Sequence, residues 1–217
     1  MEHEILSLGA SRPTRVVGLF HGLGGSRVSL EPLALQWAEA LPRTAFLLFD
    51  AGDGDWFPYP KKRAEVHTEE AWVEMVLEAV RGAIGRADAL LDERLGALGL
   101  TNDALVLGGF SQGAAMSAYT GLRRGCLGVL PMGGPCPPRP QLLPDTRQTR
   151  VCVITGDADP YAPHELISSC FAKYHQQQQQ QQQQQPDGVH IIPGLAHSIT
   201  EDHARLGLDF LRSCGCA

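Results

Sequence analysis

The chain has 217 residues, of which 43% are hydrophobic and 19% charged, and its formal net charge is -6. This composition is ordinary for a globular protein long enough to form one domain with a sizeable core. Nucleic-acid binding requires many clustered cations, and the three basic residues at 61–63 are too few for it, so we expect no nucleic-acid partner. No apolar run reaches the roughly 20 residues needed to cross a bilayer, so we also expect no stable membrane insertion.

Six apolar runs rich in Val, Ile and Leu are predicted to be strands. They cover residues 16–20, 45–49, 104–107, 129–132, 151–155 and 189–192. Near-continuous apolar strands indicate burial on both faces, as in a parallel sheet. Helical patterns separate the runs, so the sequence predicts one α/β domain over residues 1–217, with a mostly parallel central sheet and helices on both faces. Ligands of such sheets bind at the carboxyl ends of the strands.

Three helices are expected outside the motif described below. Thr68 can cap a long one, with Glu69 and Glu70 in its first turn. The others start near Pro163 and after Thr200. Their expected apolar stripes are Trp72, Val76, Ala79 and Ala83, then Leu166, Ile167, Cys170, Phe171 and Tyr174, then Ala204, Leu208 and Leu211.

Residues 176–185 form an uninterrupted glutamine tract between the second of these helices and the last predicted strand. A polar tract cannot pack a core, so we interpret it as a surface insertion that is disordered or extends the helix. We assign it no catalytic part.

The strongest local motif is Gly109-Phe110-Ser111-Gln112-Gly113, a G-x-S-x-G sequence. An apolar strand leads in and a helix of small residues leads out, which is the context of a nucleophile elbow. The sharp turn leaves no room for a Cβ at the flanking positions, and it places Ser111 at the positive end of the helix. The alternative is a glycine-rich turn with an incidental serine, and the flanking strand and helix favour the nucleophile.

A serine hydroxyl needs a base, and in this arrangement the acid and then the histidine follow the serine in the chain. The later histidines are His164, His175, His190, His197 and His203. His197 alone lies in a loop directly after a strand, where it can reach over the nucleophile. The others lie in a strand, beside the glutamine tract or on first turns of helices.

Two candidates for the acid, Asp157 and Asp159, follow the strand over residues 151–155. Asp159 is favoured because Pro160 pushes its backbone into an extended conformation. Asp157 is the better candidate for a turn residue bonded to its own backbone. The carboxylate would orient His197 and stabilise the imidazolium.

Two backbone N–H groups are expected to form an oxyanion hole, that of Gln112 and that of Leu23, in the loop after the first strand. A rival interpretation takes the G-x-G at residues 22–24 as a dinucleotide site. That fingerprint requires a glycine where Arg27 stands, and no phosphate-binding lysine follows. We therefore expect no nucleotide cofactor.

Four blocks together resemble the acyl-protein thioesterase and small carboxylesterase family of α/β-hydrolases. They are His21-Gly22-Leu23-Gly24, Gly109-Phe110-Ser111-Gln112-Gly113, Gly156-Asp157-Ala158-Asp159-Pro160 and Gly194-Leu195-Ala196-His197-Ser198. The resemblance implies a triad of Ser111, Asp159 and His197, with Leu23 and Gln112 as oxyanion donors. It also implies a lid-poor, cofactor-free enzyme acting on S-acylated proteins, lysophospholipids or short carboxylic esters, and it is compatible with a weak homodimer.

The chain departs from that family at the glutamine tract and in the loop over residues 52–60, which we call the aromatic loop. Trp56, Phe57 and Tyr59 are candidates for lining an acyl groove. The alternative is a loop pinned to the core by its aromatics. Both departures bear on the substrate more than on the chemistry.

The N-terminal residues lack the pattern of a signal peptide, so we expect a cytoplasmic protein with reduced thiols. The six cysteines form no paired C-x-x-C sets, which argues against a structural zinc. Cys214 stands four residues from the end of the chain, but Gly215 and Cys216 match prenylation poorly, so we expect an ordinary frayed tail there rather than a lipidated Cys214 or Cys216.

Overall fold

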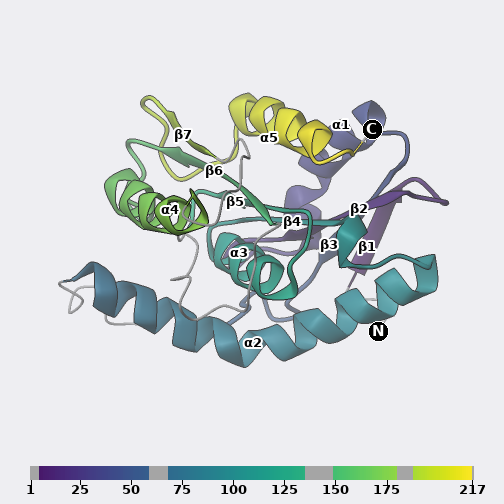
Figure 1. The fold of residues 1–217 in the computed structure, drawn as a ribbon, viewed down its shortest axis with the longest axis horizontal. Helices are drawn as coiled ribbons and strands as arrows, with labels where there is room; N and C mark the ends of the chain where they lie inside the picture. The colour runs from purple at the N-terminus through teal and green to yellow at the C-terminus, as the bar shows by residue number, and fades with distance from the viewer. Residues whose placement is uncertain (1–4, 59–67, 135–148, 180–187, 217) are drawn as a thin grey trace.

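A seven-stranded sheet forms the centre of the molecule, in the order β1-β3-β2-β4-β5-β6-β7 (Figure 1). The computed structural model describes residues 5–58, 68–134, 149–179 and 188–216. The strands are β1 Ile5–Gly9, β2 Arg15–Phe20, β3 Thr44–Phe49, β4 Leu105–Phe110, β5 Gly128–Met132, β6 Arg150–Gly156 and β7 Gly188–Ile192. β1 pairs antiparallel with β3 and every other pairing is parallel, so the predicted mostly parallel sheet is confirmed.

Helices cover both faces of the sheet, as predicted. They are α1 Glu31–Ala40, α2 Glu69–Leu98, α3 Gln112–Arg124, α4 His164–Gln179 and α5 Glu201–Ser213, with short 3₁₀ turns over Arg27–Leu30 and Asn102–Ala104. α2 and α3 lie on one side in Figure 1, and α1 and α5 on the other. The side chains of neighbouring residues in a strand point to opposite faces of the sheet. Val16 therefore packs in the core under α2 and α3, whereas Val17 packs in the core under α1 and α5.

The predicted helix starts agree with the structure. The Thr68 side chain accepts a hydrogen bond from the backbone N–H of Ala71 and caps α2. α4 continues into the glutamine tract as far as Gln179, and the rest of the tract lies outside the described residues.

Two elements were not predicted from the sequence. β1 is a short edge strand with alternating apolar residues, not the continuous apolar run used to find the others. α1 packs through Trp37, which is fully buried and donates its indole N–H to the Ala204 carbonyl at 2.8 Å. A Cβ at position 207 would overlap the Trp37 ring, so Gly207 lets α1 and α5 pack closely.

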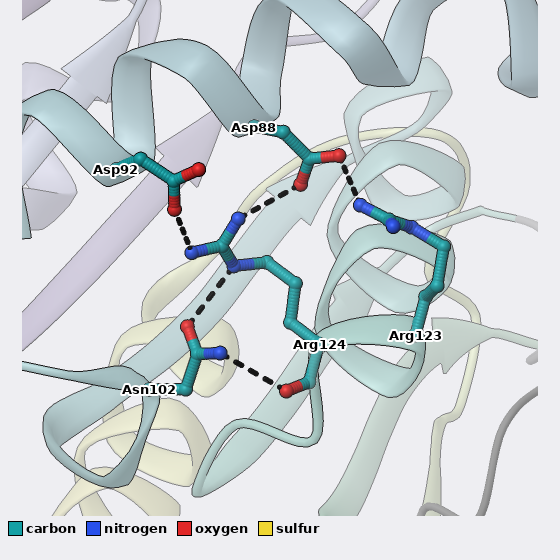
Figure 2. A network of polar contacts seen from close by, with 5 residues as sticks. All are labelled: Asp88, Asp92, Asn102, Arg123 and Arg124. Atoms are coloured by element: carbon teal, nitrogen blue, oxygen red, sulfur yellow. Dashed lines mark hydrogen bonds and ion pairs between the residues drawn. The ribbon is translucent and has the colours of Figure 1, made fainter.

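A polar network fixes the end of α3 to α2 (Figure 2). Arg124, whose side chain is only 10% exposed, binds Asp88 at 2.9 Å and also contacts Asp92. Its guanidinium donates to the Asn102 Oδ1 at 3.0 Å, and Arg123 pairs with Asp88 as well. Two cations in the last turn also complement the helix dipole. Because α3 carries Ser111 at its other end, this network helps to hold the elbow in place.

The C-terminal segment is packed, so the expectation of a frayed tail is wrong. Cys216 is fully buried, and its backbone N–H donates to the Leu211 carbonyl at 3.0 Å. Burial raises the pKa of its thiol to about 12. Cys126, Cys152 and Cys214 are also buried.

His203, a buried histidine in the first turn of α5, takes part in the N-terminal cap of this helix. The Nδ1 of His203 accepts a hydrogen bond from the Thr200 backbone N–H at 3.2 Å, so this nitrogen is unprotonated. Burial lowers the pKa of His203 to about 4, although Asp202 acts in the opposite direction. Protonation would remove the cap.

We expect this histidine to make the protein sensitive to acid. Between pH 6.5 and 4 the unfolded chain binds the proton and the folded chain does not, so stability is complete above pH 6.5 and falls as the pH is lowered. The loss should reach roughly 2–3 kcal/mol at pH 4. Gln fits the capping position, so His203→Gln should remove this part of the pH dependence in urea unfolding. The exposed His190→Gln serves as control, and equal pH slopes in all three proteins would contradict the assignment.

Candidate active site

The candidate site lies at the carboxyl edge of the sheet, where the loops after β2, β3, β4, β6 and β7 meet. β2 and β4 are neighbours in the sheet, with Phe20 in register with Gly109. The segments that follow them therefore emerge side by side: a Cβ on Gly22 would lie 3.3 Å from the Cβ of Ser111.

Ser111 occupies a strained bend between β4 and α3. Its φ of 55° and ψ of -114° make it the one non-glycine residue with positive φ in the described part of the chain. Its N–H donates to the Met132 carbonyl at 2.9 Å, which ties the bend to β5. Such backbone strain is typical of a nucleophile elbow.

The two glycines of the motif are required by close backbone approach. A Cβ on Gly113 would overlap the carbonyl oxygen of Phe20, and one on Gly109 would overlap the carbonyl oxygen of Gly113. The steric expectation from the sequence is therefore confirmed, and the neighbour that excludes the side chain at position 113 is the end of β2.

His197 lies between Ser111 and Asp159. Its Nε2 is 2.9 Å from the Ser111 Oγ, and its Nδ1 is 2.7 Å from the Asp159 Oδ2. The carboxylate side chain is 1% exposed and that of His197 is 20% exposed, so the acid is shielded while the base remains accessible. Residues separated by up to 86 positions thus form one continuous hydrogen-bonded chain.

The two aspartates after β6, Asp157 and Asp159, have different hydrogen-bond partners. The Asp159 Oδ1 accepts the backbone N–H groups of Tyr161 and Ala162, which leaves Oδ2 for His197. Asp157 accepts the Gly194 N–H at 2.6 Å and so fixes the loop that leads to His197. We expected the Asp157 side chain to hydrogen-bond to the backbone of its own turn, but it is the Asp159 side chain that does so.

The histidine ring is flanked by two aromatic side chains that the sequence did not single out. The Phe110 ring is 4.8 Å from the imidazole at 35°, and the Tyr161 ring is 5.1 Å from it in an edge contact. Tyr161 is 59% exposed. No sequence pattern marks it, since it is simply the residue after Pro160.

The expected oxyanion donors lie on either side of Ser111. Gln112 is the first residue of α3, so its backbone N–H has no acceptor within the helix. Leu23 lies in the loop beside Ser111, and its side chain is 50% exposed. Within the segments that the structure covers, the Leu23 N–H has no hydrogen-bond acceptor.

The aromatic loop packs against the core, which favours the second interpretation of it. Phe57 is 4% exposed and belongs to the core cluster under α2. Trp56 contacts Phe20 edge-on and donates its indole N–H to the His21 carbonyl at 2.9 Å. The burial of Phe57 argues against a place for it in an acyl groove, whereas Trp56 remains partly exposed and Tyr59 lies outside the described residues.

The site holds no arrangement suited to a metal: no cluster of His, Cys, Asp or Glu with that geometry occurs in the described ranges. Over the same ranges, none of the helices combines the length and apolarity needed to cross a membrane.

The sheet order and the strained serine turn define an α/β-hydrolase. The model of the phospholipase/carboxylesterase family matches residues 1–214, and the chain belongs to that family of hydrolases. Its fold is similar to that of several solved structures. The esterase PE8 shares 24% identity with a TM-score of 0.79, over 97% of this chain and 98% of that one.

Two further structures have the same fold at lower identity. A phospholipase/carboxylesterase from Dyadobacter fermentans is 22% identical with a TM-score of 0.75, covering 97% of this chain and 96% of the other. SOBER1 from Arabidopsis thaliana is 19% identical with a TM-score of 0.73, covering 92% and 98%.

Proposed function

We propose that this protein is a serine hydrolase that cleaves acyl thioesters or esters through Ser111, His197 and Asp159. The observation that carries the proposal is the hydrogen-bonded chain from Asp159 through His197 to Ser111, with distances of 2.7 and 2.9 Å. A buried carboxylate, an accessible imidazole and a hydroxyl on a strained turn are what nucleophilic acyl transfer requires.

The reaction begins with attack of the Ser111 Oγ on the acyl carbon. His197 Nε2 takes the hydroxyl proton, while Asp159 holds Nδ1–H and stabilises the imidazolium. The oxyanion of the tetrahedral intermediate accepts the N–H groups of Leu23 and Gln112, each worth roughly 2.7–4 kcal/mol in the transition state. The imidazolium then protonates the leaving thiolate or alkoxide, and an acyl-enzyme remains on Ser111.

Hydrolysis of the acyl-enzyme repeats these steps with water. His197 removes a proton from the water, the hydroxide attacks the acyl carbon, and the imidazolium returns the proton to Ser111 as the acid departs. No cofactor takes part in this sequence.

The proposed substrates are S-acylated proteins, lysophospholipids or simple acyl esters in the cytoplasm. The exposed Leu23 and Tyr161 support an apolar acyl group, because they flank Ser111 and His197 with apolar surface. The burial of Phe57 supports a second candidate, a short-chain carboxylesterase, because it removes one wall of the expected groove.

A substrate panel separates the two candidates. For the first, kcat/KM on a long-chain acyl thioester or a lysophospholipid should exceed that on a short-chain aryl ester by at least about tenfold, because each buried methylene adds roughly 0.8 kcal/mol. The reverse order would select the carboxylesterase. A fluorophosphonate probe should label the protein in both cases. Absence of both labelling and turnover would instead indicate a non-catalytic binding protein.

A further inference from the structure

The side chain of Gln112 is buried and hydrogen-bonded at both ends of its amide, although the proposed chemistry uses only its backbone. The residue is 2% exposed. Its Oε1 accepts the Trp56 backbone N–H at 2.8 Å, and its Nε2 donates to the Phe57 carbonyl at 2.7 Å. Both halves of the amide therefore bind one short segment of the loop after β3.

That segment in turn holds the loop that carries Leu23. The Trp56 indole N–H donates to the His21 carbonyl at 2.9 Å, and the Gly24 backbone N–H donates to the Gly54 carbonyl at 2.9 Å. The loop after β3 thus contacts the oxyanion loop on both sides of Leu23. Leu23 contributes little packing of its own, because its side chain is half exposed.

His21 fixes the same loop from within. It is fully buried, its Nε2 accepts the Ala51 backbone N–H at 3.1 Å, and its Nδ1 lies 2.7 Å from the Gly22 carbonyl. Since Nε2 accepts, the ring proton is on Nδ1, which donates to Gly22. A neutral imidazole therefore joins the loops after β2 and β3.

We infer that Gln112 is a positioning residue whose side chain, acting through Trp56 and His21, sets the spacing between the two proposed oxyanion donors. One donor is fixed by α3 and the other lies on a loop of a different strand. The buried and partly buried hydrogen bonds described above connect them. This inference rests on the proposed function and adds to it a role for the Gln112 side chain.

The spacing matters because oxyanion donors act only when they are preorganised. A displacement of about 1 Å can lower a rate by about 100-fold. Two loops joined by buried and partly buried hydrogen bonds resist such displacement, since a broken bond would leave a shielded polar group without a partner.

Gln112→Met tests the inference, because methionine has a similar shape and no hydrogen-bonding group. We expect kcat per active site, counted by titration of the acyl-enzyme, to fall about 10- to 100-fold, with KM changed by less than about twofold. The affinity for a trifluoromethyl ketone, which forms an oxyanion adduct with the serine, should fall in proportion to kcat/KM. A merely structural role would lower the melting temperature and leave kcat per titrated site unchanged, and that result would overturn the inference.

Two further variants sharpen the test. Gln36→Met makes the same change on the exposed face of α1 and should leave both constants as in the wild type. Trp56→Phe removes the indole N–H and part of the ring that contacts Phe20 and His21, and it replaces Gln112→Met if that variant does not fold. The double variant should lose less than the product of the two single losses, and independent losses would overturn the network. A wild-type protein that hydrolyses no ester would instead overturn the proposed function.

Discussion

Replacing Ser111 with alanine should lower kcat on the order of 10⁵-fold and abolish labelling by a fluorophosphonate probe. The loss is large because no other hydroxyl is hydrogen-bonded to His197 in the described part of the chain. Thermal unfolding should change little. Alanine keeps the Cβ that makes the φ of 55° unfavourable, and the backbone bond to Met132 remains.

Ser198→Ala is the matched control, because Ser198 is an exposed serine next to His197 in the chain. It should retain kcat within about threefold, as expected for a substitution of an exposed side chain. The measurement is steady-state hydrolysis of the best ester from the panel, with circular dichroism to verify the fold. If Ser111→Ala keeps more than a hundredth of wild-type turnover, Ser111 is not the nucleophile.

The parallel sheet could be predicted from the sequence because burial on both faces leaves a local signal. The strands from β2 to β6 are almost entirely buried, and their apolar runs predict them to within a few residues. β7 is also predicted from its apolar residues, although the structure leaves them half-buried or exposed. β1 gives no such signal, because Ser7 and Gly9 interrupt its apolar residues. Its pairing with β3 is a tertiary property.

The contacts among Ser111, His197 and Asp159 could be predicted from short motifs because each residue lies in the segment that follows a strand. Parallel strands bring their carboxyl ends to one edge, so chain order and loop position were enough to place Ser111 and His197 within hydrogen-bond reach. Pro160 favours Asp159 over Asp157, and Asp159 is the one that contacts His197.

The aromatic loop could not be interpreted in this way. An aromatic side chain after a strand can line a pocket or pack in the core, and which of the two occurs depends on the residues that pack against it. The role of the Gln112 side chain could not be predicted from a local pattern either. Its motif marks a backbone donor, and the two hydrogen bonds of its side chain depend on the path of residues 50–57, which no local pattern specifies.

Asp159→Asn should lower kcat about 10⁴-fold without disturbing the site, because it changes the proton pattern and not the shape. The Oδ1 would still accept the N–H groups of Tyr161 and Ala162. The new NH₂ group would face His197 Nδ1, now 2.7 Å from Oδ2, and would donate to it. The histidine would then carry its proton on Nε2, where it could no longer accept the proton of Ser111.

The control is Asp157→Asn, two residues away. Its Oδ1 would still accept the Gly194 N–H, and Asp157 does not contact His197, so kcat should stay within about threefold of wild type. Because the histidine of the Asp159 variant is in the wrong tautomer to act as a base, activity should recover in part at high pH, where hydroxide can remove the proton of Ser111 instead. The profile of kcat against pH measures this directly. Equal losses in the two asparagine variants would mean that loop rigidity, and not the orientation of His197, accounts for the role of Asp159.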